Sequence, residues 1–304
     1  MILPSAPTSP VVDSHVHVWN LERAEYSWPI DGPLFREIDV PEIAPALNAA
    51  GINQIILVQA ADNAEDTANM IAVADRNPIV TGIVGWVPLD DADAAAQLLA
   101  SYEPDRRIVG IRSLLHTRPD PAWITQPTPD ATLALIEAAG LTFDYVTGSP
   151  ASLMHLPGIG ERHPTLRIVL DHLGKPPIGG TTAERREWRS LLASAAENPL
   201  LSAKVSGLYP AAGDMEQWTV DLIRPFVDDA LEIFGTDRLM FGGDWPVSIL
   251  AGGYSRTWSA LSEIFADLDS AGRAAVAGGT ASTVYRLAPR LGQPGSENGD
   301  SLPR

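Results

Sequence analysis

The sequence contains no cysteine, and this absence removes several kinds of chemistry at once. Without thiols the chain has no disulfides, no thiolate metal site and no cysteine nucleophile. It also lacks any run of about 18 apolar residues, so no membrane span is expected. Its first residues, MILPSAPTSP, have neither a basic n-region nor a long apolar h-region. No signal peptide is therefore expected, and the cytoplasm is the default compartment.

Basic residues are scarce as well. Lys and Arg number 21 against 38 Asp and Glu, which gives a net charge of -17. Such an acidic surface repels phosphate, so we expect neither a nucleic-acid partner nor an anionic membrane partner. Hydrophobic residues make up 45% of the 304 positions, enough for a full core. No linker divides the chain, which predicts one domain at residues 11–290, an N-terminal tail at 1–10 and a disordered tail at 291–304.

Short apolar segments alternate with helix-like segments along this domain. Strands are expected at residues 11–19, 52–60, 81–89, 108–115, 141–147, 166–173, 201–208 and 238–244, each followed by a helix. The alternation implies a parallel sheet, and eight units predict an α/β fold of the (β/α)8 TIM-barrel type. A helical extension runs to about residue 287. The long segment 20–39 after the first strand shows no clear periodicity of hydrophobic residues. It is either a lid or a surface excursion.

Two histidines stand close together in the first predicted strand. His15 and His17 share one face of that strand because side chains alternate. Two imidazoles on one face suit a metal ion or the polarisation of one oxygen atom. An H-x-H pair also occurs often by chance, so its meaning depends on what other strands bring to it.

Other strands do end on polar residues, and a barrel gathers strand ends at one face. Asp244 ends the eighth strand, which neighbours the first in a closed barrel, and His172 ends the sixth. Three imidazoles and one carboxylate then converge, a set suited to a divalent ion such as zinc or to polarising a carbonyl. The predicted catalytic residues, which are also the predicted metal ligands, are His15, His17, His172 and Asp244.

A second group of residues at these strand ends is predicted to bind the substrate. Arg112 offers paired donors for a carboxylate or hydroxyls, and Asp144 on the next strand is its expected structural partner. Lys204 either reaches the barrel mouth or is a buried ion-pair partner. Asp171 alternates away from His172, so we expect it to be structural. The predicted substrate-binding residues are Gln59, Trp86, Arg112, Asp144, Tyr145, Lys204 and, from the long loop, Trp28.

Six motifs together resemble a known family. They are VDSHVHVW, GWVPL, VGIRSLLH, LDHLGKP, KVSGL and FGGDWPV, spread from about residue 11 to residue 287. They are similar to the amidohydrolase superfamily, and more narrowly to its amidohydrolase-related branch of fuconolactonase-like sugar lactonases and pyrone-dicarboxylate lactonases. The resemblance implies that His15, His17, His172 and Asp244 are metal or catalytic positions and that Arg112 binds substrate.

The chain departs from the two-metal members of that superfamily. Those members have a bridging lysine near the end of strand four, where this sequence offers Arg112 and His116, and strand five has no histidine. We therefore expect at most one divalent ion, with zinc favoured. Because the branch includes lactonases that work without a metal, catalysis by the histidines alone stays open.

The resemblance implies a cytoplasmic hydrolase of carbohydrate metabolism that opens a small cyclic ester, a sugar lactone or a related lactone. Asp244 would activate water, and the histidines or one metal would polarise the carbonyl. A metal-dependent non-oxidative decarboxylase of the same superfamily is the first alternative, and a non-catalytic barrel that binds a small sugar acid is the second. A homo-oligomer is compatible with each of these functions.

Overall fold

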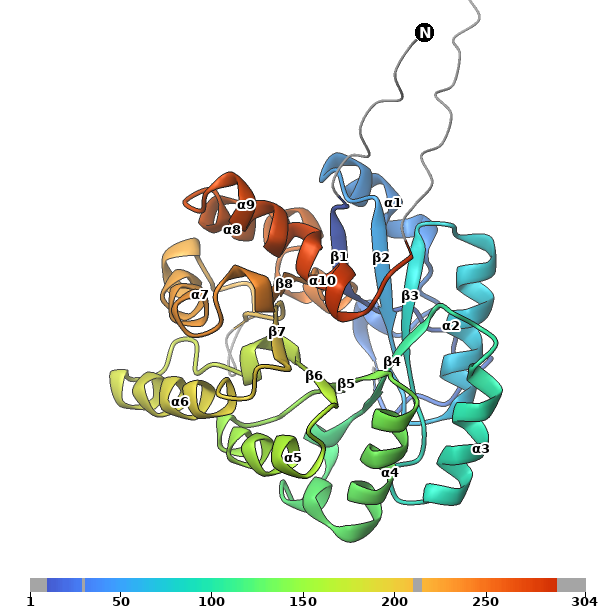
Figure 1. The fold of residues 1–304 in the computed structure, drawn as a ribbon. Coiled ribbons are helices and arrows are strands. Elements are labelled where there is room, and N and C mark those ends of the chain that lie inside the picture. Colours follow the sequence, from blue (N-terminus) through green and yellow to red (C-terminus); the bar gives the residue numbers. More distant parts are fainter. Residues whose placement is uncertain (1–9, 29–30, 210–214, 289–304) are drawn as a thin grey trace, which may run out of the picture.

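The computed structural model describes residues 10–28, 31–209 and 215–288. Of the two predicted tails, 291–304 and all of 1–10 except Pro10 lie outside these ranges. Eight parallel strands form one sheet in chain order and are surrounded by helices (Figure 1). The (β/α)8 barrel predicted from the sequence is confirmed. Its strands are β1 (Val12–Val16), β2 (Gln54–Val58), β3 (Val80–Gly85), β4 (Ile108–Ser113), β5 (Thr142–Tyr145), β6 (Arg167–Leu170), β7 (Leu201–Val205) and β8 (Leu239–Phe241).

Helices follow the strands and form the outer layer. Their starts are set by local sequence: Thr181 and Glu184 form a reciprocal capping box at the first turn of α6, and Asn63 caps α2. Within the described residues no helix is long and apolar enough to cross a membrane. The helices are α1 (Val40–Ala49), α2 (Ala64–Arg76), α3 (Ala92–Tyr102), α4 (Pro127–Ala138), α5 (Leu156–Arg162), α6 (Thr182–Ala195), α7 (Val220–Phe234), α8 (Tyr254–Phe265), α9 (Ser270–Ala274) and α10 (Thr280–Val284).

The barrel has two apolar layers. One lies between the strands and the outer helices, and the other fills the interior. Strands buried on both faces explain the continuous apolar runs of the sequence. The C-terminal extension belongs to the interior layer, because Ala281 of α10 and the following Tyr285 pack against Val12, Val109 and other inward valines. In Figure 1, α10 lies beside β1 and β8.

Backbone contacts between β8 and β1 close the barrel. The amide of Asp244 donates to the carbonyl of His15 at 2.9 Å, and the amide of His17 donates to the carbonyl of Trp245 at 2.7 Å. An isolated parallel bridge joins Val16 to Trp245. The end of the eighth strand is therefore held directly against the two histidines of the first, as predicted for a closed barrel.

The long segment after β1 is fixed by its aromatic residues. The indole of Trp19 donates to the carbonyls of Leu34 and Arg36, at 3.2 and 2.8 Å. Trp28 packs edge-to-face on Trp19 with ring centroids 5.3 Å apart. The hydroxyl of Tyr26 donates to Asp66 of α2 at 2.7 Å. These contacts place the described part of this segment against the rim of the barrel.

Candidate active site

A β-bulge turns both histidines of β1 into the barrel. Asp13 pairs with Ile55 and Val16 pairs with Leu57, so β1 takes three steps where β2 takes two. The extra residue shifts the inward face from Val12 to His15 and His17. Both imidazoles are buried. Simple alternation predicted that the two histidines share a face, and the bulge decides which face that is.

The backbone after β8 brings Asp244 to these histidines. A Cβ atom on Gly242 would lie 2.7 Å from the Cβ of His15, so only glycine allows this close approach. Asp244 itself has a φ of 50°. Its carboxylate lies 3.8 Å from Nε2 of His15 and 3.7 Å from Nε2 of His17. Asp244 is thus within reach of both imidazoles, as the sequence predicted.

His172 also enters the cluster through a left-handed backbone. Its φ and ψ are 54° and 36°, and its ring centroid is 4.6 Å from that of His15. Nδ1 of His172 pairs with the hydroxyl of Ser206 at 2.9 Å. A Cβ on Gly207, which has a φ of 58°, would lie 2.4 Å from the same nitrogen. Gly207 therefore provides the space that the His172 ring occupies.

The predicted orientation of Asp171 was wrong. Alternation along β6 places Val169 in the barrel interior, so Asp171 faces inward too and is buried. His172 follows it inward only because the chain leaves the strand after Leu170 and turns through positive φ. Applying alternation beyond the end of the strand gave the wrong face for Asp171.

Four charged side chains form a layer beneath the histidines, which we call the charged layer: Arg112, Asp144, Asp171 and Lys204. All four are buried. Arg112 and Asp144 are register partners on β4 and β5, yet their expected ion pair does not form. Nη1 of Arg112 instead donates to Asp171 at 2.9 Å, and Nζ of Lys204 donates to Asp144 at 2.6 Å. Lys204 is therefore a buried ion-pair partner, which was the second of its two predicted roles.

Burial and neighbouring charge shift the pKa values of this region. Burial alone raises the pKa of Asp171, but the Lys204 ammonium and the Arg112 guanidinium hold that pKa well below its usual range. Burial lowers the pKa of His15 well below its ordinary value, and burial also lowers the pKa of His172. Both imidazoles are consequently neutral at pH 7, the form that binds a metal or donates and accepts hydrogen bonds.

The four remaining predicted substrate-binding residues lie in four different places. Gln59 is buried; its backbone carbonyl accepts from Nη2 of Arg112, and its side-chain amide donates to the backbone carbonyl of Arg112 at 3.2 Å. Trp86 is partly buried after β3. Trp28 packs in the loop as described. Tyr145 is a correction, because its ring lies in the outer layer and its hydroxyl donates to the Ser152 carbonyl at 3.0 Å.

Asp13 and Tyr285 are parts of the site that the sequence analysis missed. Asp13 accepts from the amides of His15 and Gly243, at 3.0 and 2.8 Å, and from the hydroxyl of Tyr254 at 2.8 Å. It thereby ties the bulge of β1 to the turn that carries Asp244, and burial raises its pKa to about 6. Its position two residues before His15 in the sequence was a signal from which a role in the site could have been predicted. The hydroxyl of Tyr285 donates to Asp144 at 2.7 Å, a contact that no local pattern indicates.

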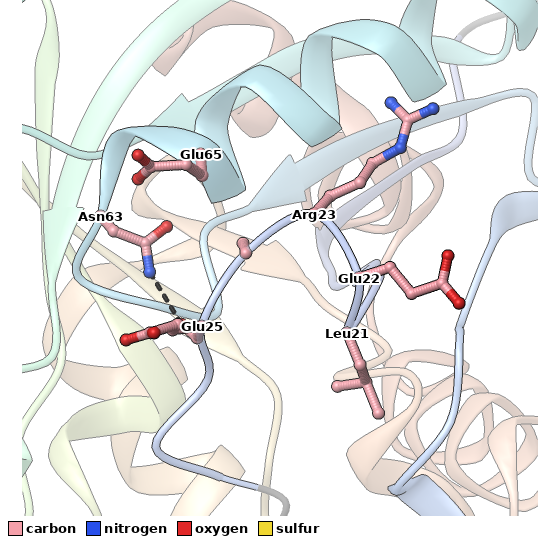
Figure 2. A pocket seen from close by; sticks show the side chains of 7 residues that line it. Leu21, Glu22, Arg23, Glu25, Asn63 and Glu65 are labelled. Atoms are coloured by element: carbon pink, nitrogen blue, oxygen red, sulfur yellow. Dashed lines mark hydrogen bonds between the residues drawn. The ribbon is translucent and has the colours of Figure 1, made fainter.

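A hollow of about 350 Å³ lies apart from this cluster, beside the loop after β1. It is lined by residues 21–25 with Asn63 and Glu65 (Figure 2). Glu22 points away from Glu25 and Glu65 in this view, so the carboxylates that line the hollow do not converge. The histidine–aspartate cluster, and not this hollow, is the candidate active site.

The cluster fits one divalent metal ion. His15, His172 and Asp244 each offer one ligand atom, and these atoms lie within 4.8 Å of one another. Imidazole nitrogen and carboxylate oxygen are common zinc ligands. Nε2 of His17 lies 3.1 Å from Nε2 of His15, next to the same group.

We expect at most one tightly held divalent ion per chain. A second ion needs further ligands near β4, where the guanidinium of Arg112 offers only N–H donors and cannot coordinate. Elemental analysis of the dialysed protein tests this, with His155→Gln as a control outside the cluster. Two tightly bound ions per chain would contradict it.

Comparisons with known proteins agree with this geometry. A family model described as amidohydrolase matches residues 12–287. An L-fucono-1,5-lactonase of Burkholderia ambifaria is 35% identical over 285 residues, which cover 91% of this chain and 95% of that protein. A second L-fucono-1,5-lactonase, from Burkholderia multivorans, is 33% identical over 294 residues, covering 91% and 96%.

Among solved structures, an amidohydrolase from Burkholderia multivorans with bound zinc superposes with a TM-score of 0.84 at 28% identity, covering 92% of this chain and all of that one. The fold and the site define an amidohydrolase-type barrel. The chain belongs to the amidohydrolase family, which confirms the resemblance found in its motifs.

Proposed function

We propose that the protein hydrolyses a sugar lactone, with Asp244 as the general base. The observation that carries this proposal is the position of the Asp244 carboxylate, 3.8 and 3.7 Å from Nε2 of His15 and His17. A carboxylate beside two imidazoles can take a proton from water while the imidazoles act on the carbonyl oxygen. The names of the two Burkholderia lactonases support a sugar lactone as the substrate.

The reaction needs two proton transfers, and one carboxylate serves both. Asp244 removes a proton from water as the water oxygen bonds to the lactone carbonyl carbon. Hydrogen bonds from the site stabilise the oxyanion that forms. When the ring carbon–oxygen bond breaks, the leaving alkoxide takes the proton from Asp244. The product is an open-chain hydroxy acid, which releases a proton to the solvent.

His15, His172 and Asp244 would hold a metal ion, and a zinc ion there would supply Lewis-acid polarisation of the lactone carbonyl. Arg112 would orient the substrate. Its Nη1 lies 3.4 Å from Nε2 of His15, so its guanidinium borders the place where the lactone would sit.

We expect sugar lactones to be hydrolysed and simple amides to be left intact. The test is a panel of γ- and δ-lactones read with a pH indicator, led by L-fucono-1,5-lactone, with aromatic acids assayed in parallel for carbon dioxide. A protein-free blank measures spontaneous ring opening. Carbon dioxide from an aromatic acid without acid release from any lactone would favour the decarboxylase. Binding of a sugar acid without turnover would favour the non-catalytic barrel.

A further inference from the structure

The hydrogen bond made by His17 fixes which of its ring nitrogens carries the proton. Nδ1 of His17 lies 2.8 Å from the carbonyl oxygen of Val58. A carbonyl oxygen only accepts hydrogen bonds, so Nδ1 of His17 must be the donor. In a neutral imidazole with its proton on Nδ1, Nε2 has no proton and presents a lone pair to the site.

His15 has the opposite arrangement, and Lys204 is the cause. Nζ of Lys204 lies 3.2 Å from Nδ1 of His15 in hydrogen-bonding geometry. A lysine ammonium only donates, so Nδ1 of His15 must accept and its proton is on Nε2. Oδ1 of Asp171 also lies 3.3 Å from this nitrogen, but the same oxygen lies 3.1 Å from Nζ of Lys204, so the ammonium can supply its hydrogen bond.

The two assignments agree with the contact between the rings. Nε2 of His15 and Nε2 of His17 are 3.1 Å apart, and the opposite tautomers give one donor and one acceptor across that distance. Identical tautomers would set two lone pairs or two N–H groups against each other. Nη1 of Arg112 also faces Nε2 of His15, but at 3.4 Å, longer than the usual 2.7–3.2 Å of such bonds, and it already donates to Asp171 at 2.9 Å.

Lys204 is held in this position from several sides. Its Nζ is 2.6 Å from Asp144 and 3.1 Å from Asp171, and its side chain is fully buried. Tyr285, from the C-terminal extension, donates to the same Asp144 oxygen at 2.7 Å. A buried ammonium fixed between two carboxylates cannot turn away from His15 without losing these partners.

We propose that Lys204 is a positioning residue that holds His15 as the Nε2–H tautomer, so that His15 is a hydrogen-bond donor in the site and a weakened metal ligand. Coordination through Nε2 of His15 requires a lone pair there, so the proton must move to Nδ1, where it faces the Lys204 ammonium. Lys204 therefore favours donation to an oxygen atom over binding of a metal. The identification of this oxygen as a lactone carbonyl rests on the proposed function. The assignment of the His15 tautomer does not depend on it.

Two variants separate the effect of the Lys204 ammonium from the effects of the other residues in the charged layer. Asp144→Asn is the matched control, because its amide oxygen still accepts from Lys204 and Tyr285. The double variant Asp144→Asn/Lys204→Met also removes the ammonium and leaves Asp171 paired with Arg112. Proton-coupled ¹⁵N spectra of histidine-labelled, metal-free protein report each tautomer, and His15→Gln identifies the His15 signals.

We expect His15 to be the Nε2–H tautomer in the wild type and in Asp144→Asn, and the Nδ1–H tautomer in the double variant, where Asp171 becomes its acceptor. Zinc should bind the double variant about tenfold or more tightly than Asp144→Asn, the size of effect typical of a residue behind a metal ligand. An Nδ1–H His15 in the wild type, or equal zinc affinity of the two variants, would overturn the proposal. If the double variant does not fold, the wild-type spectrum alone decides.

Neither measurement uses a lactone, so its result is separate from that of the substrate panel. A tautomer that follows Lys204 in a protein with no lactonase activity would leave this inference standing and remove the proposed function. Lactonase activity in a protein whose His15 tautomer does not follow Lys204 would remove the role of Lys204 and leave the proposed function standing.

Discussion

Replacing Asp244 with Asn should lower kcat by ~10²-fold or more while the fold survives, because the amide cannot take a proton from water. The fold should survive because Asn tolerates the positive φ of 50° at this position better than most residues. The backbone bond from its amide to the His15 carbonyl, at 2.9 Å, does not involve the side chain.

Asp267→Asn is the matched control for this variant. Its carboxylate is exposed on the far side of the outer layer and pairs with Arg224 at 2.6 Å. It should retain wild-type kcat. Near-normal turnover of Asp244→Asn, with an unchanged circular dichroism spectrum, would remove Asp244 from the mechanism.

The second large effect is expected at Arg112, where stability and substrate binding should both fall. Arg112→Met leaves the buried carboxylate of Asp171 without its 2.9 Å partner. Breaking a buried ion pair in this way costs about 3–5 kcal/mol, which should appear as a clear drop in Tm. Losing a charge-assisted hydrogen bond to substrate costs about 1.5–3 kcal/mol, so KM should rise roughly tenfold or more, with a smaller loss of kcat.

Two further variants separate these effects. Arg112→Met/Asp171→Asn also removes the carboxylate that has lost its guanidinium partner, so it should recover part of the Tm while KM stays high. Arg107→Met loses an ion pair with Asp105 outside the barrel interior and should keep the wild-type KM. An unchanged KM in folded Arg112→Met protein would assign Arg112 a structural role alone.

The sequence predicted the barrel and the main cluster because both depend on simple rules. Apolar runs alternating with helical segments indicate parallel strands, and chain order then places Asp244 beside His15 and His17. The boundaries were less accurate. The strand expected at residues 11–19 ends at Val16.

The errors within the site share one physical origin. Alternation holds only inside a regular strand, whereas the bulge in β1 and the positive φ of His172 both break it. The partners of Arg112 and Lys204 were also missed. Side chains meet across the barrel interior, so register between adjacent strands does not determine which charges pair.

Isotope labelling shows whether water opens a lactone at its carbonyl carbon. The reaction is run in H₂¹⁸O with L-fucono-1,5-lactone, and the product is analysed by mass spectrometry against a protein-free blank. We expect protein-dependent conversion to a hydroxy acid heavier by one labelled water, with the ¹⁸O in its carboxyl group. A lactone converted no faster than in the blank, or a product that has lost carbon dioxide, would contradict it.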